Sequence, residues 1–562
     1  MASHFIIECL DCGHRTPFIA SASDCPNCHS TWREAIYDYN RLSKSLLLQV
    51  TGRPFDLWRY RELLPVRTID PAISLGEGGT PMLHAANLGG KLGCQNIFIK
   101  DERQGPTGSF KDRQAAVTIA ALKESGINEL VVASTGNVAI AYSAYAARAG
   151  IRLWAFLTSL VPAEKMREVA LYGTQVIKVT GSYDEAKQVA ADFARQRSIF
   201  YDLGTRTISC VESMKTVSFE IAEQLTALLG PPTSSDKSKP GVTFYSPDWY
   251  IQSVSGGLGP VGVHKGFQEF KKMGFIDHIP KLGLIQAEGC APMVHAWKQN
   301  QDVAIPVQNP NTLIATLATG DPGRTYTVLR QKMMSASGGA FESVQDEEAF
   351  RAMHYLAKME GISVEPAAAV AFAGMIKLIR SGVIKSDEVI VINCSGHTMP
   401  IEQKIMGEGW SKDVKAPSQK LESGSEEGLL SALTEISVDR FPRIVIVDDE
   451  PDARRLIRRI LQTQGDYTLF EVGNGREAVE LVNREIPNLI ILDLMLPELD
   501  GFSVMDELQK KPETAEIPII VVTAKELTQN EKLRLQGHIQ KLMQKGDFLT
   551  DELLDEVKSL LR

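Results

Sequence analysis

Lys111 is the residue whose surroundings most strongly indicate chemistry. It follows the loop Pro106–Phe110, which comes after the apolar run Ile97–Ile99. We expect a strand, a glycine-containing loop and then a helix running from Asp112. A lysine at such a junction can contact a phosphate, or it can act as a Schiff-base nucleophile when its ammonium is desolvated or lies beside positive charge. The alternative is a solvated lysine at a helix start, although the helix dipole disfavours a cation there.

A second glycine-containing turn, Ser253–Pro260, lies between the apolar run Trp249–Ile251 and the helical stretch Val261–Met273. Strand, glycine loop and helix together present free backbone N–H groups and a positive helix end to a phosphate. With a lysine in a small-residue loop, this turn indicates a phosphorylated aldehyde cofactor. The backbone expected to hold its phosphate is that of Gly256, Gly257, Leu258 and Gly259.

Two further polar turns follow expected strands. Ser134–Asn137 follows Leu130–Ser134, and Asn393–Thr398 follows Glu388–Ile392. Either alone is compatible with an ordinary turn, but ligands of open α/β sheets bind at the carboxyl ends of strands. The donors expected to hold a substrate carboxylate are those of Ser134, Thr135 and Gly136.

Four of the eight cysteines form two Cys-x-x-Cys pairs near the start of the chain. Paired thiolates at this spacing are typical of a tetrahedral zinc site, and a closed four-sulfur site is structural rather than catalytic. A redox pair or two disulfides are the alternatives. The expected zinc ligands are Cys9, Cys12, Cys25 and Cys28.

The elements that position these turns alternate in type along the chain. Leu153–Leu157 and Gln175–Val179 are further expected strands, and Ala139–Arg148 is an expected helix. Such alternation indicates an α/β fold with parallel sheets covered on both faces.

The length and net charge of the chain limit the number of domains and the classes of binding partner. A chain of 562 residues is long enough for two to four domains. The net charge of −9 argues against nucleic acid or an anionic membrane surface as the main partner. No apolar run has spanning length and the N-terminus lacks the features of a signal peptide, so we expect a cytoplasmic protein.

The motifs resemble the threonine synthase branch of fold-type II pyridoxal-phosphate enzymes, from about Leu75 to His397. The resemblance implies two open α/β domains, a bound amino-acid substrate, and elimination or replacement at a β- or γ-leaving group. It implies that Lys111 carries pyridoxal phosphate as a Schiff base and moves protons. It further implies that Asn137 binds the ring hydroxyl and that Ser395 faces the pyridine nitrogen. The matching segments are Leu75–Pro81, Pro106–Arg113, Ala133–Asn137 and Gly361–Pro366.

Two positions depart from that branch. Val138 stands where a threonine is usual, and Cys210 stands where an arginine commonly binds the substrate phosphate. We therefore expect phosphohomoserine to be a poor substrate unless Arg206 or Lys215 compensates. The N-terminal cysteine pairs are also similar to those of cysteate synthase, which makes β-replacement on O-phosphoserine, as in cysteate or cysteine synthase, the alternative reaction.

In the last section of the chain, acidic residues follow directly after apolar runs. Asp448 and Asp449 follow Arg443–Val447, and Asp493 follows Leu489–Leu492. Crowded acids at the carboxyl ends of parallel strands need a cation, and magnesium prefers oxygen ligands. We expect Asp449 and Asp493 to bind it directly and Asp448 through water. A purely structural acidic pocket is the alternative.

This section resembles a response-regulator receiver domain with a flavodoxin-like (βα)5 fold. The resemblance implies that Asp493 accepts a phosphoryl group from a histidine kinase or another phosphodonor. Thr523 would sense that group, and Lys545 would pair with it. Leu542 occupies the place of the usual switch aromatic.

The expected domains are a zinc ribbon (1–36), a catalytic region (37–410), a linker (411–440) and a receiver (441–562), in a chain that forms a homodimer. Three functional hypotheses follow from this organisation. The first is a pyridoxal-phosphate enzyme regulated by phosphorylation. The second is the same enzyme with a receiver used only for docking or dimerisation, and the third is a degenerate enzyme domain that senses a metabolite.

Overall fold

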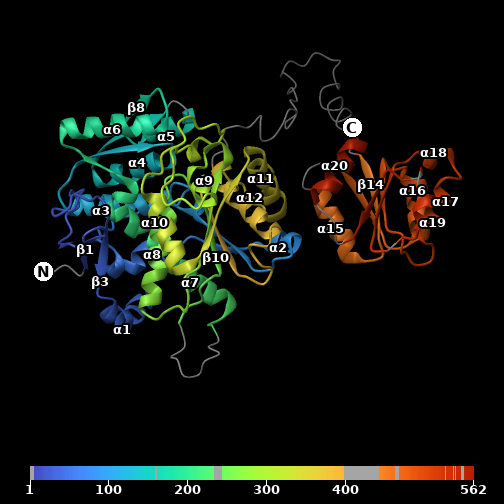
Figure 1. Ribbon diagram of the computed structural model, residues 1–562, viewed down its shortest axis with the longest axis horizontal. Helices are drawn as coiled ribbons and strands as arrows, with labels where there is room; N and C mark the ends of the chain where they lie inside the picture. The colour runs from blue at the N-terminus through green and yellow to red at the C-terminus, as the bar shows by residue number, and fades with distance from the viewer. Residues whose placement is uncertain are drawn as a thin grey trace, which may run out of the picture. The chain divides into compact units, whose positions relative to one another are not determined.

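The structure is a computed structural model that describes residues 5–158, 161–232, 243–397, 442–462, 467–525, 527–535, 537, 539–545 and 550–561. The chain divides into two compact units, Met1–Glu402 and Gln403–Arg562 (Figure 1). The predicted linker 411–440 lies outside the described residues. Within the described parts, no helix has both the length and the apolar character needed to cross a membrane.

The larger sheet of the first unit has the strand order β12-β11-β10-β13-β5-β4. All neighbouring strands are parallel except β4, which pairs with β5 antiparallel. Its central strands are buried on both faces, which explains their apolar sequences. The strands are β4 (Met82–His84), β5 (Ile97–Asp101), β10 (Trp249–Ser253), β11 (Lys281–Ala287), β12 (Gly339–Val344) and β13 (Ile390–Cys394).

Helices cover both faces of this sheet. α12 packs against β10, β11 and β13, while α7 and α8 share a core with Leu282 and Leu284 on the alternate face of β11. The helices of this part are α2 (Ala86–Leu92), α3 (Lys111–Glu124), α7 (Ile208–Leu229), α8 (Leu258–Lys272), α9 (Pro292–Lys298), α10 (Thr325–Lys332), α11 (Asp346–Glu360) and α12 (Pro366–Arg380).

A smaller parallel sheet has the order β8-β7-β6-β9 and carries α4, α5 and α6. β8 occupies the range predicted from the sequence, and α4 begins two residues before the predicted helix. Its elements are β6 (Glu129–Ser134), α4 (Asn137–Ala149), β7 (Arg152–Thr158), α5 (Ala163–Leu171), β8 (Gln175–Val179), α6 (Tyr183–Arg197) and β9 (Phe200–Tyr201).

The N-terminal segment forms a three-stranded antiparallel sheet, followed by α1 and a 3-10 helix, η1. Its buried residues Phe5, Ile7 and Tyr37 belong to the same core as Met214 and Phe267 of α7 and α8. The segment therefore packs as a continuation of the core beneath the larger sheet. The elements are β1 (Phe5–Cys9), β2 (Arg15–Thr16), β3 (Arg33–Tyr37), α1 (Tyr39–Val50) and η1 (Leu57–Leu63).

The second unit contains a five-stranded parallel sheet in the order β15-β14-β16-β17-β18. Separate apolar cores lie on its two faces. This confirms the predicted (βα)5 arrangement. The strands are β14 (Arg443–Val447), β15 (Thr468–Val472), β16 (Leu489–Leu492), β17 (Ile519–Thr523) and β18 (Lys541–Gln544), and the helices are α15 (Pro451–Gln462), α16 (Gly475–Glu485), α17 (Gly501–Leu508), α18 (Pro512–Ala515), α19 (Gln529–Leu535) and α20 (Thr550–Leu560).

Candidate active site

Lys111 is the first residue of α3 and lines a cavity of the first unit. Burial lowers the pKa of its ammonium to about 8, although the nearby Cys210 and Asp202 oppose that shift. Its Nζ lies 4.2 Å from the centre of the Phe110 ring. A lysine with this pKa is neutral in a substantial fraction of molecules near pH 8, as a nucleophilic amine requires.

Buried ion pairs fix the helix turn that carries Lys111. Arg113 donates to Glu102 Oε2 at 2.9 Å and to Glu220 Oε1 at 2.6 Å, and Lys100 Nζ lies 2.7 Å from Glu220 Oε2. Despite burial, the flanking cations lower the pKa of Glu220 to about 2. The negative charge of Glu220 therefore persists, and it holds α3 against α7.

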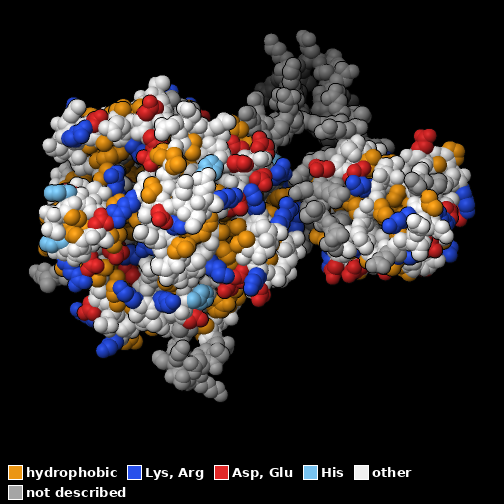
Figure 2. All heavy atoms as spheres, viewed as in Figure 1, with side chains coloured by type: hydrophobic (Ala, Val, Ile, Leu, Met, Phe, Trp, Pro, Cys, Tyr) orange, Lys and Arg blue, Asp and Glu red, His pale blue; other side chains and the backbone are white. Residues whose placement is uncertain are grey.

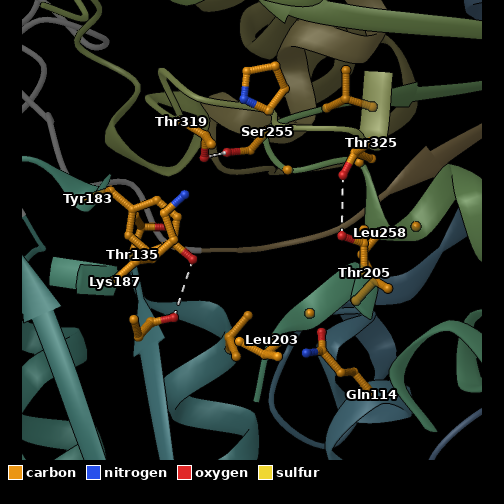
Figure 3. Close-up of a pocket in the computed structure, with 18 of the residues that line it drawn as sticks. Gln114, Thr135, Tyr183, Lys187, Leu203, Thr205, Ser255, Leu258, Thr319 and Thr325 are labelled. Atoms are coloured by element: carbon orange, nitrogen blue, oxygen red, sulfur yellow. Dashed lines mark hydrogen bonds between the residues drawn. The ribbon is translucent and has the colours of Figure 1, made fainter. Parts of the chain in front are cut away.

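The cavity has a volume of about 840 Å³ and lies where strands of both sheets end. The structure brings most of the predicted site residues into its wall, since Lys111, Thr135, Asn137, Ser395 and the loop 256–259 all line it. Figure 3 shows Thr205 and Thr325 as neighbours in the cavity wall, joined by a hydrogen bond of 3.2 Å between their hydroxyl oxygens. Tyr183 and Lys187 lie together in another part of the wall, with Lys187 Nζ 5.1 Å from the centre of the Tyr183 ring (Figure 3).

The predicted phosphate loop opens α8 at this cavity. Gly257 is the N-cap residue with a φ of 81°, and no side chain caps the helix. A Cβ on Gly257 would lie 2.7 Å from a Thr325 methyl carbon, whereas one on Gly256 would meet open space. The uncapped backbone N–H groups at a positive helix end suit a phosphate, so these residues fit that part of pyridoxal phosphate.

The Ser395 turn is tied to the lysine loop. Ser395 Oγ accepts from the Phe110 N–H at 3.1 Å, and the Gly396 N–H donates to Gly108 O at 3.1 Å. Because the serine oxygen already accepts a hydrogen bond, its own O–H is available to donate to a ring nitrogen.

The residues of the loop predicted to bind a carboxylate, Ser134–Gly136, have different roles. Ser134 Oγ accepts from the N–H groups of Gly136 and Ala139 at 3.0 and 3.1 Å, so it closes the first turn of α4. Thr135 faces the cavity instead. Among the three predicted residues, Thr135 therefore offers its side chain to a ligand, while Ser134 and Gly136 shape the turn.

The two departures from the threonine synthase pattern have different surroundings. Val138 lines the cavity, whereas Cys210 is fully buried, with its Sγ 3.2 Å from Asp202 Oδ1. The prediction that Lys215 could compensate is wrong, because this lysine is fully buried and its Nζ lies 2.8 Å from Glu269. Arg206 lines the cavity.

Sequence reasoning missed several polar residues of the site. Asp202 lines the cavity and accepts from Tyr142 at 2.6 Å and from Gln114 at 2.9 Å. It directly follows β9, so the rule that ligands bind at strand ends could have identified it. Lys165 and Glu365, which contact Asn137, have no local signal that distinguishes them from surface charges.

The four predicted zinc ligands lie together. Their Sγ atoms are all within 4.8 Å of one another, with Cys9 and Cys28 at 3.5 Å and Cys12 and Cys25 at 3.7 Å. Four thiolates around one zinc at about 2.3 Å place their sulfurs about 3.8 Å apart, so the donor set fits the metal.

The second unit has an acidic pocket at the ends of β14 and β16. Ligand oxygens of Asp448, Asp449 and Asp493 lie within 4.8 Å of one another, and Lys545 Nζ is 2.7 Å from Asp448 and 2.6 Å from Asp493. Burial raises the pKa of Asp448. Thr523 is buried at the end of β17. Hard oxygen donors at this spacing suit a magnesium ion.

On the face of the first unit seen in Figure 2, acidic and basic side chains are interspersed.

Comparisons with known proteins agree with the division of the chain into two units. Residues 73–396 match the family model described as pyridoxal-phosphate dependent enzyme, and residues 444–558 match the response regulator receiver domain. A protein named threonine synthase from Methanosarcina acetivorans is 34% identical over 401 residues, which is 71% of this chain and 93% of the relative. Another of that name from Methanocaldococcus jannaschii is 36% identical, over 65% of this chain and 85% of the relative.

Among solved structures, diaminopropionate ammonia lyase from Escherichia coli in complex with D-serine matches with a TM-score of 0.50 and 15% identity. The match covers 62% of this chain and 95% of that chain. At this identity the match supports the fold alone.

The pKa of Lys111 predicts a pH profile for its reactivity. In cofactor-free protein, labelling of Lys111 by an amine-selective reagent should rise with a midpoint near pH 8, because burial lowers the pKa from 10.5 to about 8. Asp202→Asn should move the midpoint lower still, since that carboxylate raises the pKa. Mass spectrometry of the labelled peptide against pH measures both shifts, and a midpoint above pH 10 in the unaltered protein would contradict the burial argument.

Proposed function

We propose that this chain, which belongs to the pyridoxal-phosphate-dependent enzymes and carries a C-terminal receiver domain, is a lyase. Its substrate would be an amino acid with a β- or γ-leaving group. The observation that carries this proposal is a single cavity lined by Lys111, the uncapped start of α8 and Ser395. The relatives named threonine synthase support elimination followed by replacement as the reaction type.

When bound, pyridoxal phosphate supplies an electron-withdrawing ring that weakens the Cα–H bond of the substrate. Lys111 would hold the cofactor aldehyde carbon through its Nζ. The same Nζ, when free, would accept a proton from the substrate Cα and return a proton to the product. The backbone of Gly256, Gly257, Leu258 and Gly259 binds the cofactor phosphate.

The remaining contacts orient both reactants. Asn137 would donate to the ring hydroxyl, and Ser395 would donate to the pyridine nitrogen without protonating it, which favours loss of a leaving group over amino transfer. The loop Ser134–Gly136 binds the substrate carboxylate. Arg206 supplies a positive charge in the same wall for an anionic leaving group.

A substrate screen tests this function. The protein loaded with pyridoxal phosphate should release phosphate or a keto acid from at least one of phosphohomoserine, O-phosphoserine, serine and threonine. Lys111→Ala should lower that rate at least a hundredfold, because general acid–base catalysis alone contributes about 10²–10⁴-fold. Efficient threonine formation would identify phosphohomoserine as the substrate. Binding without turnover of any of these would favour a metabolite sensor.

We also propose that Cys9, Cys12, Cys25 and Cys28 hold one structural zinc. Metal analysis should find one equivalent per chain, and Cys12→Ser should lose it because three thiolates bind zinc more weakly than four. Cys94→Ser, at a buried cysteine outside the cluster, is the matched control and should keep the metal. Absence of zinc, or disulfides in protein kept under reducing conditions, would contradict the assignment.

For the receiver, we propose that Asp448, Asp449 and Asp493 bind magnesium and that Asp493 accepts a phosphoryl group from a partner kinase. A small phosphodonor with magnesium should phosphorylate the chain at Asp493, and Asp493→Asn should block it. The added charge should draw Lys545 and Thr523 toward the phosphoryl group. Leu542 is no aromatic switch, so we expect a graded or oligomeric response.

Turnover, substrate affinity or oligomer size should therefore differ between the phosphorylated protein and Asp493→Asn. The coupling free energy between phosphorylation and the enzyme's conformation should be about 1–3 kcal/mol. If none of the three differs, the receiver serves only for docking or dimerisation.

A further inference from the structure

The amide of Asn137 lies in a triangle of hydrogen bonds with two charged side chains. Lys165 Nζ donates to Asn137 Oδ1 at 2.7 Å and to Glu365 Oε2 at 3.0 Å. Asn137 Nδ2 donates to Glu365 Oε1 at 2.9 Å. Each of the three side chains is therefore hydrogen-bonded to the other two.

This arrangement permits one orientation of the amide. Rotating it by half a turn would set its NH₂ group against the Lys165 ammonium and its oxygen against the Glu365 carboxylate. Both contacts would be repulsive, because an ammonium only donates and a carboxylate only accepts. One hydrogen of Nδ2 is used by Glu365, which leaves the second for a ligand in the cavity that Asn137 lines.

The two charges are buried and come from different halves of the unit. Lys165 is 3% exposed on α5, beside the smaller sheet, and Glu365 is 5% exposed just before α12, which covers the larger one. A Cβ on Gly136 would lie 2.9 Å from Lys165 Cδ, and one on Gly396 would lie 2.1 Å from Glu365 Cδ. The glycines thus make room for a pair that joins both halves at the cavity.

We infer that Lys165 and Glu365 are positioning residues that orient the Asn137 amide so that it donates to the ring hydroxyl of pyridoxal phosphate. This inference rests on the proposed function, which makes Asn137 a cofactor ligand. Lys165 does not line the cavity and acts through the amide oxygen. Because the triangle spans both sheets, the amide is correctly oriented only while the two halves are held together.

The test measures cofactor affinity and the absorption maximum of the bound cofactor, which a purely structural role would leave unchanged. Lys165→Met should weaken binding of pyridoxal phosphate about tenfold, as expected for loss of one hydrogen bond, and shift the absorption maximum. Lys165→Arg should restore much of both, since a guanidinium also donates. Lys123→Met is the control, because Lys123 is an exposed lysine outside the cavity that donates to a backbone carbonyl, Ala149 O, at 2.7 Å.

Lys165→Met leaves a buried carboxylate unpaired, which can impair folding. The double variant Lys165→Met/Glu365→Gln removes both charges, and it should fold yet show the same weakened binding and shifted maximum. Unaltered affinity and spectrum in the folded double variant would overturn the inference and leave the proposed function intact. An unaltered protein that binds no pyridoxal phosphate would overturn both.

Discussion

The buried ion pairs of Arg113 with Glu102 and Glu220 are the constraint on which the active site depends. Arg113 lies two residues beyond Lys111, and these pairs attach the start of α3 to α7 and to Glu102, the residue that follows β5. Removing one partner from such a cluster typically costs about 3–5 kcal/mol, because the remaining charge stays buried without compensation. An intact buried ion pair adds little net stability, so the main effect of this cluster is to fix the position of Lys111.

The same helix, α7, connects the lysine to the other end of the site. Glu220 binds Arg113, and two turns earlier Glu212 pairs with Lys265 of α8, the helix whose uncapped start faces the cavity. Tyr37 of the N-terminal sheet donates to Glu212 at 3.0 Å. One rigid element thus sets the separation between Lys111 and the phosphate loop, and the four-cysteine segment packs onto that element.

The sequence was sufficient for features that depend on neighbouring residues. Strand, turn and helix periodicity located β8, α4 and the turns at Lys111 and Gly257, since local backbone preferences decide them. It was insufficient for contacts between distant segments. Lys165 and Glu365 are 200 residues apart, and Lys215 resembled an available cation until α8 supplied its carboxylate partner. Burial and long-range pairing decide such roles, and neither has a local pattern.

The most direct test of the account is to map where pyridoxal phosphate attaches. Borohydride reduction of the loaded protein, followed by peptide mass spectrometry, should place one cofactor on Lys111 and none on the buried Lys165. The Lys111→Ala variant should take up none. Attachment at another lysine, or no attachment to correctly folded protein, would contradict the assignment of this cavity as the catalytic site.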